Sequence, residues 1–570
     1  MRFVYSLLLS FLFSVSLFAQ SSKNTKIPDL ILFNGKIFTG NNTMFSQALA
    51  IKNNLILKVG TSLEIKKLAK KGTQIINLEG KMVMPGINDA HIHFLSGSLG
   101  LNKINLNDCT TEQEALDSIA AFAKKNLTKK WITGMGWQYK IFKSGMPNKS
   151  SLDKIINDRP VFIEAYDGHS AWANSKALEL AGINSETKFV GFGETIKDEN
   201  GQPTGAITEA ACYLVDKFIP KPTRAEKLDA LKTGMKYAAT LGITSIQNAS
   251  GDLEEFELYQ YLLKKGLMTL RSSTAFSVGK STTQADINSF LKLNNSMANN
   301  PFLKAGAIKF VLDGVIESHT AVMLKPYSDV APTGKIANGK IALDYHIYKK
   351  LVTQLDKLGF QIYTHAIGDS SVRAALNAYE YAKKTNQTFN RRHRIEHIEQ
   401  SNTIDIPRFA KLGILASMEP IHADPGTIDV WSKAVGNERL PFSFVWNTIL
   451  KNNIKLVFSS DWPACITPNP MRGLHNAVNR RTIDGLPENG WVPEQKISIT
   501  EAIKAYTEGG AYSSFEENKK GKIAKGYLAD IIVLSQNLFE IPPMDIYKTK
   551  VLMTIFNGKI VYNNSIKIDK

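Results

Sequence analysis

The sequence predicts an α/β fold in which a closed barrel carries a smaller β-rich domain built from both ends of the chain. Between residues 83 and 520, short apolar runs alternate with amphipathic stretches, the pattern of strands and helices in α/β folds. Residues 28–82 and 521–562 instead show short strands and turns at hairpin spacing. Two such segments can pair only if the intervening chain returns to its start, and a closed barrel does this.

Ten apolar runs in and beside the central segment have the length and flanks of buried strands. A barrel needs eight, so we expect one or two of the ten in an insertion. We place this insertion at about residues 138–222, which are rich in Gly, Pro and polar side chains. Helices are expected between the strands, for example over 111–125, 225–241 and 344–357. The expected strands are 82–87, 131–134, 161–165, 244–247, 270–275, 307–312, 361–365, 394–396, 414–417 and 455–459.

The first nineteen residues have the pattern of a secretory signal peptide. A short basic start, Met1-Arg2, precedes an almost entirely apolar run from Phe3 to Phe18. The alternative is an uncleaved N-terminal anchor. The signal peptide predicts an exported protein, periplasmic or secreted, that has no membrane attachment after cleavage. The 3 cysteines give no disulfide framework, so the core must supply the stability of the chain.

The basic charge does not by itself indicate a nucleic-acid partner. The formal net charge is +17 among 570 residues. The lysines are scattered as pairs, such as Lys66-Lys67 and Lys349-Lys350, and no basic stripe interleaved with aromatic residues is visible. We therefore interpret the lysines as solvated surface and expect no nucleic-acid binding.

The chemistry begins at His91-Ile-His93, which follows an apolar strand and the turn residues Pro85-Gly86. Alternate side chains of a strand share a face, so the two imidazoles point the same way. Two imidazoles at this spacing can bind one metal ion. A structural role for either histidine is the alternative if the pair is considered alone.

Three later strands end in further metal-binding side chains. His365 ends one strand, His397 ends the next, and Asp461 follows a third. In α/β barrels the catalytic groups lie at the carboxyl ends of the strands. Histidines and a carboxylate at successive strand ends therefore predict one metal centre.

Lys309 lies inside an apolar strand, where an unpaired ammonium group is costly. Reaction with CO₂ would convert it to an anionic carbamate, whose two oxygens can bridge two metal ions. Alternatively, the stem packs and the head reaches solvent. The sequence leaves both readings open.

Taken together, these motifs resemble the amidohydrolase superfamily, specifically its amidohydrolase-3 branch of YtcJ-like and N-substituted formamide deformylase-like proteins. The resemblance covers about residues 28–562. It rests on Pro-Gly-x-x-Asp-x-His-x-His at 85–93, Gly-Met-Gly-Trp at 134–137, Asp-Gly-His-Ser-Ala-Trp-Ala-Asn at 167–174, Lys-Phe-Val-Leu-Asp-Gly at 309–314, His-Ala-Ile-Gly-Asp at 365–369, Arg-His-Arg-Ile-Glu-His at 392–397, Ser-Met-Glu-Pro-Ile-His at 417–422 and Ser-Asp-Trp-Pro at 460–463.

The resemblance implies a TIM-type barrel with a small β-sandwich built from both termini, and one or two divalent metal ions, usually zinc. It implies that His91 and His93 are first-strand ligands and that Lys309 corresponds to the lysine that is carboxylated in some members. It further implies that His365 and His397 are fifth- and sixth-strand ligands, that Asp461 binds metal and moves the proton, and that His169 and His422 face the substrate carbonyl or leaving group. Gln138, Cys465 and the segment 317–319 depart from the usual pattern and bear on specificity.

The predicted activity is hydrolysis of a C–N bond, other than a peptide bond, in an amide, an N-formyl or N-acyl amine, or a cyclic amide. Such centres activate a water molecule. Ester or phosphoester hydrolysis at the same centre, and a non-catalytic barrel that only binds a ligand, are the alternatives. The sequence leaves open whether the chain forms a homo-oligomer. The aromatic and Met residues near the motifs suggest a partly apolar substrate pocket; they are Trp137, Trp172, Trp462 and Met418.

Overall fold

The protein is described by a computed structural model. Its described residues are 27–41, 44–165, 170–190, 193–329, 337–339 and 341–567. The expected signal peptide over residues 1–19 lies outside them, and export stays a prediction. Among the described residues, none of the helices combines the length and apolar character needed to cross a bilayer.

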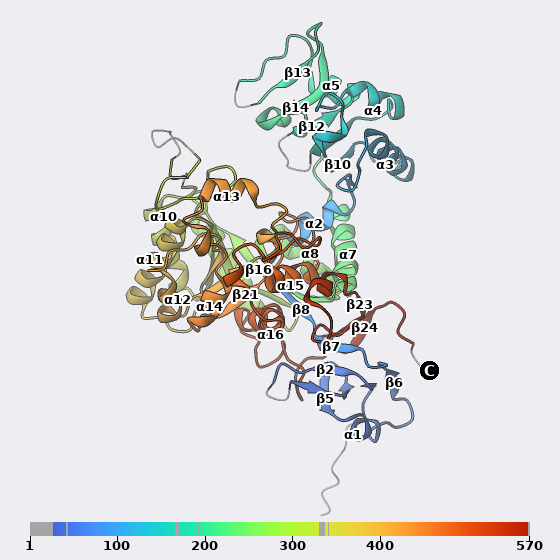
Figure 1. Ribbon diagram of the computed structural model, residues 1–570, viewed down its shortest axis with the longest axis vertical. Coiled ribbons are helices and arrows are strands. Elements are labelled where there is room, and N and C mark those ends of the chain that lie inside the picture. Colours follow the sequence, from blue (N-terminus) through green and yellow to red (C-terminus); the bar gives the residue numbers. More distant parts are fainter. Residues whose placement is uncertain are drawn as a thin grey trace, which may run out of the picture.

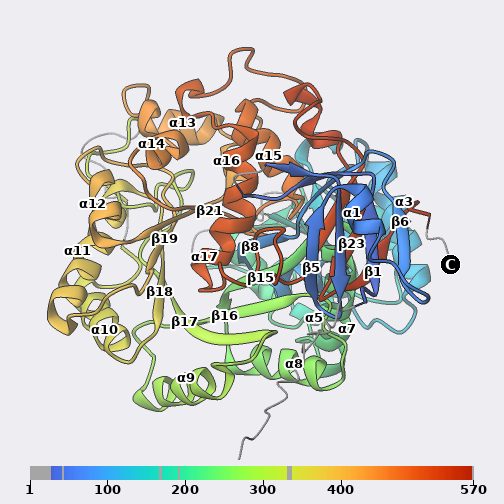
Figure 2. The same cartoon turned by 90° about the horizontal axis from the view of Figure 1, so that it is seen from below.

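Eight parallel strands follow one another in chain order around the expected TIM-type barrel, with helices outside the strands (Figure 2). Main-chain hydrogen bonds join the last strand region to the first, because Asp461 N–H donates to the His91 carbonyl (2.8 Å) and His93 N–H donates to the Trp462 carbonyl (2.9 Å). The strands are β8 (Ile87–Ile92), β15 (Ile243–Gly251), β16 (Arg271–Ser277), β17 (Leu303–Val311), β18 (Gln361–Ala366), β19 (Arg394–His397), β20 (Leu415–Met418) and β21 (Leu456–Phe458).

Alternation along the barrel strands sorts their side chains into outward and inward sets. Phe276 points outward and packs on Phe290 of α9, while Phe310 packs on Tyr348 of α10. The helices of this domain are α2 (Phe94–Gly100), α7 (Arg224–Thr240), α8 (Leu253–Lys264), α9 (Gln284–Met297), α10 (Tyr345–Lys357), α11 (Asp369–Asn386), α12 (Ile406–Leu412), α13 (Asp429–Val435), α14 (Trp446–Lys451), α15 (Pro470–Asn479), α16 (Ile499–Lys504) and α17 (Gly510–Ser513).

Two sheets at the chain ends lie below the barrel in Figure 1. One has the order β5-β4-β1-β6 and the other β24-β23-β22-β7-β2-β3, so the second contains strands from both ends of the chain. Leu32 of the first sheet and Val83 and Ile531 of the second belong to one buried cluster. The elements are β1 (Leu30–Phe33), β2 (Lys36–Phe38), β3 (Phe45–Ser46), β4 (Ala48–Lys52), β5 (Leu55–Gly60), α1 (Ser62–Lys66), β6 (Gln74–Asn77), β7 (Met82–Pro85), β22 (Ile531–Leu534), β23 (Val551–Phe556) and β24 (Lys559–Asn563).

The insertion is larger than expected and projects away from the barrel (Figure 1). Its six-stranded sheet begins at Ile104, so the expected start at residue 138 is too late. Two runs expected as strands, 131–134 and 161–165, pair with each other in this sheet and not in the barrel. The elements are β9 (Ile104–Asn105), α3 (Glu112–Lys125), β10 (Ile132–Trp137), α4 (Lys149–Ile155), β11 (Val161–Ala165), β12 (Ser170–Ala173), α5 (Ser175–Ala181), β13 (Thr195–Lys197), β14 (Pro203–Thr208) and α6 (Tyr213–Asp216).

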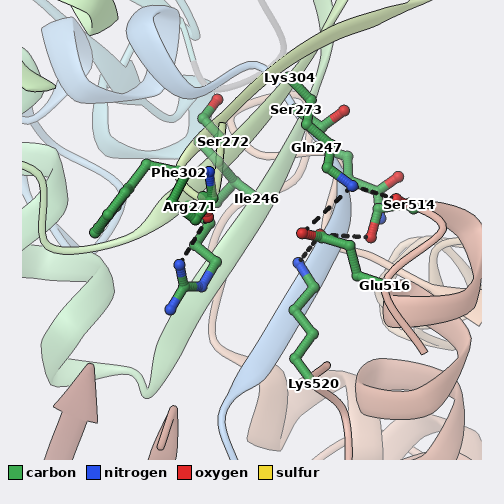
Figure 3. Close-up of a pocket in the computed structure, with 11 residues that line it drawn as sticks. Ile246, Gln247, Arg271, Ser272, Ser273, Phe302, Lys304, Ser514, Glu516 and Lys520 are labelled. Carbon is green, nitrogen blue, oxygen red and sulfur yellow. Dashed lines mark hydrogen bonds and ion pairs between the residues drawn. The ribbon is translucent and has the colours of Figure 1, made fainter. Parts of the chain in front are cut away.

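A group of opposite charges lies beside the amino ends of β16 and β17. Figure 3 shows Lys304, Glu516 and Lys520 around a small pocket there, with the Lys520 ammonium directed at Glu516. Lys520 Nζ lies 2.7 Å and Lys304 Nζ 3.3 Å from the Glu516 carboxylate. Lys304 also donates to the Ser514 carbonyl at 2.7 Å. These contacts attach the C-terminal segment to the amino end of the barrel.

Replacing Glu516 by Gln should remove an acid-sensitive part of the stability. Burial acts to raise the pKa of the Glu516 carboxyl, but Lys520 and Lys304 outweigh it and hold the pKa at about 2. Since the folded pKa lies below the ordinary value, this stabilisation is complete near neutral pH and is lost as the pH falls from about 5 to about 2. We expect the free energy of unfolding of the wild type to fall by on the order of 2–3 kcal/mol over this pH range, as measured by urea unfolding at each pH.

The E516Q variant should have a lower free energy of unfolding than the wild type at neutral pH. Its free energy of unfolding should also fall less between neutral and acidic pH. Glu179→Gln is the matched control, because its exposed pair with Lys176 should contribute less than about 1 kcal/mol. Identical acid profiles for the wild type and E516Q would show that this cluster does not stabilise the fold.

Candidate metal centre

The site lies at the carboxyl end of the barrel, where β8 brings His91 and His93 to one side. His91 is fully buried and His93 is partly exposed. The main-chain bond that closes the barrel places Asp461 directly beside them. A second anchor holds the Asp461 loop, because Ser460 donates to Asp89 through its amide (3.0 Å) and its hydroxyl (2.6 Å).

The spacing of three side-chain atoms fits a zinc ion. Asp461 Oδ1 lies 3.1 Å from His93 Nε2 and 3.4 Å from His91 Nε2. Ligand atoms at about 2.0–2.1 Å from a tetrahedral zinc ion would be separated by about 3.3–3.4 Å. Oδ1 is buried and has no hydrogen-bond partner among the described residues. Two imidazoles and one carboxylate are a donor set that zinc favours, so these residues fit a divalent ion.

Carboxylates behind the histidines orient their rings. Glu396 Oε2 lies 2.6 Å from His91 Nδ1, and Glu419 Oε2 lies 2.8 Å from His397 Nδ1. An ionised carboxylate accepts from Nδ1–H, which leaves Nε2 as the nitrogen with a free lone pair. Other groupings of these side chains, such as His397 with Glu419 and His422, also lie within ligand reach of one another. We assign Glu396 and Glu419 as orienting groups because each already pairs with an Nδ1.

A buried arginine balances the charge beneath the site. Arg394 is fully buried, and its Nε lies 2.5 Å from Glu396 Oε1. Its guanidinium also donates to Gln247 Oε1 at 2.7 Å and lies 3.5 Å from the centroid of the Tyr363 ring. Burial raises the pKa of Glu396, and Arg394 is the largest influence that opposes this, because its charge favours the ionised form. The ionised carboxylate would accept a hydrogen bond from the proton-bearing Nδ1 of His91.

The structure gathers the remaining histidines around the same point. The ring centroids of His365 and His397 are 4.4 Å apart, and those of His91 and His397 are 4.9 Å apart. Lys309 Nζ lies 3.1 Å from His91 Nε2, and the side chain is almost fully buried. The residues that sequence reasoning assigned as ligands, His91, His93, Lys309, His365, His397 and Asp461, therefore form one cluster.

Left-handed backbone turns bring two of these side chains into the centre. His397 has φ = 73° and Asp461 has φ = 55°. Such conformations are costly for residues with a side chain and occur at functional sites. On β19, Arg394 and Glu396 alternate toward the interior, so His397 would point away from it if the strand continued regularly. The turn after Glu396 explains why His397 contributes to the same site.

Charge and burial set the protonation of the site. Burial, then the charges of Lys309 and His397, hold the pKa of His91 well below its ordinary value, so it is the neutral form that binds metals. Burial acts to raise the pKa of Asp461, but His93 and the charges of His397 and His422 outweigh it and lower the pKa. Asp461 is therefore a carboxylate at neutral pH.

His422, on the short helix η3 (Pro420–Ala423), adds a cation beside Asp461. Its Nε2 lies 3.7 Å from Asp461 Oδ2, and its Nδ1 lies 3.2 Å from Glu399. Burial acts to lower its pKa, but the bond with Glu399 and the charge of Asp461 raise it to about 10. Trp431 donates to the other Glu399 oxygen at 2.8 Å. The other residue expected to face the substrate, His169, lies outside the described residues.

The four residues suggested for an apolar pocket are all buried in the structure. Trp137 and Trp172 belong to the core of the insertion and have no exposed surface, and their indole N–H groups donate to the carbonyls of Ile163 and Asn148. Met418 is fully buried on the outer face of β20, and Trp462, 7% exposed, packs against Phe94. Their large apolar side chains are used for packing, and of the four only Trp462 keeps accessible surface.

Sequence reasoning missed the residues that orient the ligands. Glu396, Glu419 and Arg394 were not singled out, nor was Ser250, whose hydroxyl lies 2.7 Å from His93 Nδ1. A usable signal was present for Arg394 and Glu396, since their alternation places two charged side chains inside the barrel. Ser250 and Glu419 lie near strand ends, where the sequence does not give side-chain direction.

The chain is similar to known proteins over most of its length. The sequence profile described as "Amidohydrolase family" matches residues 74–562. Protein LONG AFTER FAR-RED 3 of Arabidopsis thaliana is 31% identical and the match covers 94% of this chain and 92% of that protein. Putative amidohydrolase YtcJ of Bacillus subtilis (strain 168) is 28% identical over 91% and 96%, and N-substituted formamide deformylase of Arthrobacter pascens is 24% identical over 95% and 99%.

A solved structure shows the same architecture. The crystal structure of an uncharacterised metal-dependent hydrolase from Pyrococcus horikoshii OT3 superposes with a TM-score of 0.72. Its sequence is 25% identical, and the match covers 90% of this chain and 99% of that one.

Replacing Glu419 by Gln should weaken zinc binding about 10–100-fold, the usual effect of losing a partner behind a ligand. The neutral amide keeps the shape of the side chain but accepts less strongly from His397 Nδ1–H. The affinity is measured by competition with a chromophoric chelator. Glu438→Gln, an exposed carboxylate, is the control and should bind zinc as the wild type does. Unchanged affinity in E419Q would contradict the orienting role.

Proposed function

Because the chain belongs to the amidohydrolase family, a family of metal-dependent hydrolases acting on C–N bonds, we propose that its substrate is an amide, an N-formyl or N-acyl amine, or a cyclic amide. The observation that carries this proposal is the spacing of His91, His93 and Asp461, which matches a zinc ligand set. The similarity to N-substituted formamide deformylase supports N-substituted formamides as the first substrates to test.

The proposed ligands divide between two positions. His91, His93 and Asp461 would hold one divalent ion, for which zinc is the best match to the donor atoms. His365 and His397 would hold a second, and a carboxylated Lys309 would lie between the two. Burial lowers the pKa of the Lys309 amine, which favours the neutral form that attacks CO₂. The nitrogen lone pair forms the new N–C bond, and the amine releases a proton.

The chain's own residues then account for the proton movements. A divalent ion held at this site supplies a Lewis acid and lowers the pKa of a water molecule toward about 7. Asp461 is ionised and buried, so it can accept a proton from the attacking water and return it to the leaving nitrogen. His422 is protonated and lies beside Asp461, so it can donate a hydrogen bond to the oxygen on which charge develops.

We also propose that the two terminal sheets form a single small β-sandwich domain. The cluster they share supports this arrangement, since it contains Leu32 and Ile51 of one sheet and Val83, Ile531 and Met553 of the other. Such a domain fixes the start of β8, which follows β7 directly in the chain.

Asp461→Asn should abolish most turnover without unfolding the protein. The amide retains the size of the carboxylate but cannot accept the proton, so we expect kcat/KM for an N-substituted formamide to fall by about 10²–10⁴-fold. Amine release measures the rate, and circular dichroism and metal content check the fold and the centre.

His346→Gln provides the matched control, because this histidine is exposed on α10. Full activity of the D461N protein would exclude Asp461 as the proton carrier. Cleavage of a matched ester, with no cleavage of any amide, would instead move the assignment to ester hydrolysis.

A further inference from the structure

The open end of the barrel has two chemically different sides. Strands β8, β18, β19, β20 and β21, with the turns after them, supply the histidines and the carboxylates of the site. The last residues of β15, β16 and β17 are Gly251, Ser277 and Val311, which carry no charge. Asp313, in the turn after β17, is buried and accepts hydrogen bonds from the main-chain amides of Val322, Ile367 and Gly368. Lys309 is two residues before Val311 on β17, so the two side chains lie on the same face of the strand. At the level of the strand ends, the residues next to Lys309 on this side are therefore neutral.

The side-chain direction of Ser277 and Val311 follows from their strand neighbours. Ala275, Ala307 and Tyr363 form a small cluster inside the barrel, whereas Phe276 and Phe310 pack on the outer helices. Ser277 is two residues beyond Ala275, and Val311 is four residues beyond Ala307. Alternation therefore directs both side chains toward the barrel interior.

The register places these two residues beside the ligands. Ser277 is paired with Lys309 on the neighbouring strand, and Val311 is paired with His365. Ser277 is exposed, and Val311 keeps 45% of its surface accessible although it faces inward. An apolar side chain that faces the site and stays accessible can contact a bound molecule. We call the pair Ser277 and Val311 the neutral wall.

We propose that the neutral wall binds the uncharged substituent of the substrate, next to the amide that reacts at His91, His93 and Asp461. This inference rests on the proposed amide hydrolysis. When the reacting carbonyl group lies beside the metal ligands, the substituent of the amide extends toward the other side of the barrel end, over β16 and β17. A charged substituent packed against Ser277 and Val311 would lose water, and neither side chain carries a charge to pair with it, which is unfavourable. The substrate class is therefore an amide with a compact aliphatic or aromatic substituent that carries no charge.

The test uses three formamides that differ only in charge: N-benzylformamide, its para-carboxylate and its para-aminomethyl derivative. Binding is measured by calorimetry and hydrolysis by amine release, for the zinc-loaded wild type, Val311→Asp and Val311→Asn. We expect the wild type to prefer the neutral amide by about tenfold or more in both affinity and kcat/KM, a typical value for one pocket contact.

The V311D variant should bind the neutral amide about tenfold more weakly and should gain affinity for the aminomethyl compound. The V311N variant should weaken neutral binding but gain nothing for the cation, which separates charge from polarity. Leu63→Asp, on exposed α1 outside the barrel, is the control and should match the wild type. Zinc content checks that the centre is intact in each variant.

Equal binding of the three amides by the wild type, no binding of the neutral amide, or an unchanged preference in V311D would overturn the neutral wall. Failure of the proposed function is separate. If no amide is hydrolysed although the neutral one binds and V311D weakens it, the wall stands and the assigned reaction does not.

Discussion

The main-chain hydrogen bond from Asp461 to the His91 carbonyl is the contact on which the site depends. It joins the end of the last barrel strand to the first, and it places the Asp461 carboxylate against both histidines of β8. Asp89 reinforces this contact by binding Ser460 from the same strand. The same main-chain contact therefore closes the barrel and places Asp461 beside His91 and His93.

The second constraint is the balance of buried charge. Lys309 and Arg394 lie inside the barrel with Glu396, Glu419 and Asp461, and every one of these groups is almost fully buried. An isolated charge at this depth would be strongly unfavourable, but paired charges are tolerated. The pairing also has a chemical result, because Arg394 opposes the burial that raises the pKa of Glu396, and the contact of Glu396 with Nδ1 leaves Nε2 of His91 facing the centre.

The sequence was informative where a regular strand ends in a histidine or an aspartate. The alternation of His91 and His93, and the strand ends at His365 and Asp461, were sufficient to predict one cluster. His397 was identified from its motif, but its direction depends on a left-handed turn that alternation does not predict. The strands of the insertion have the same apolar pattern as barrel strands, so the boundary could not be set from the sequence. Trp137 and Trp172 were expected near the substrate because they lie close to the motifs, but both pack in the hydrophobic core of the insertion.

The most direct measurement of the central claim is anomalous X-ray scattering at the zinc absorption edge, from crystals of the protein grown with zinc. The account predicts a peak about 2.0–2.2 Å from His91 Nε2, His93 Nε2 and an Asp461 oxygen. A zinc-soaked crystal with no peak between these three residues, or with zinc held only by His422 and Glu419, would contradict it.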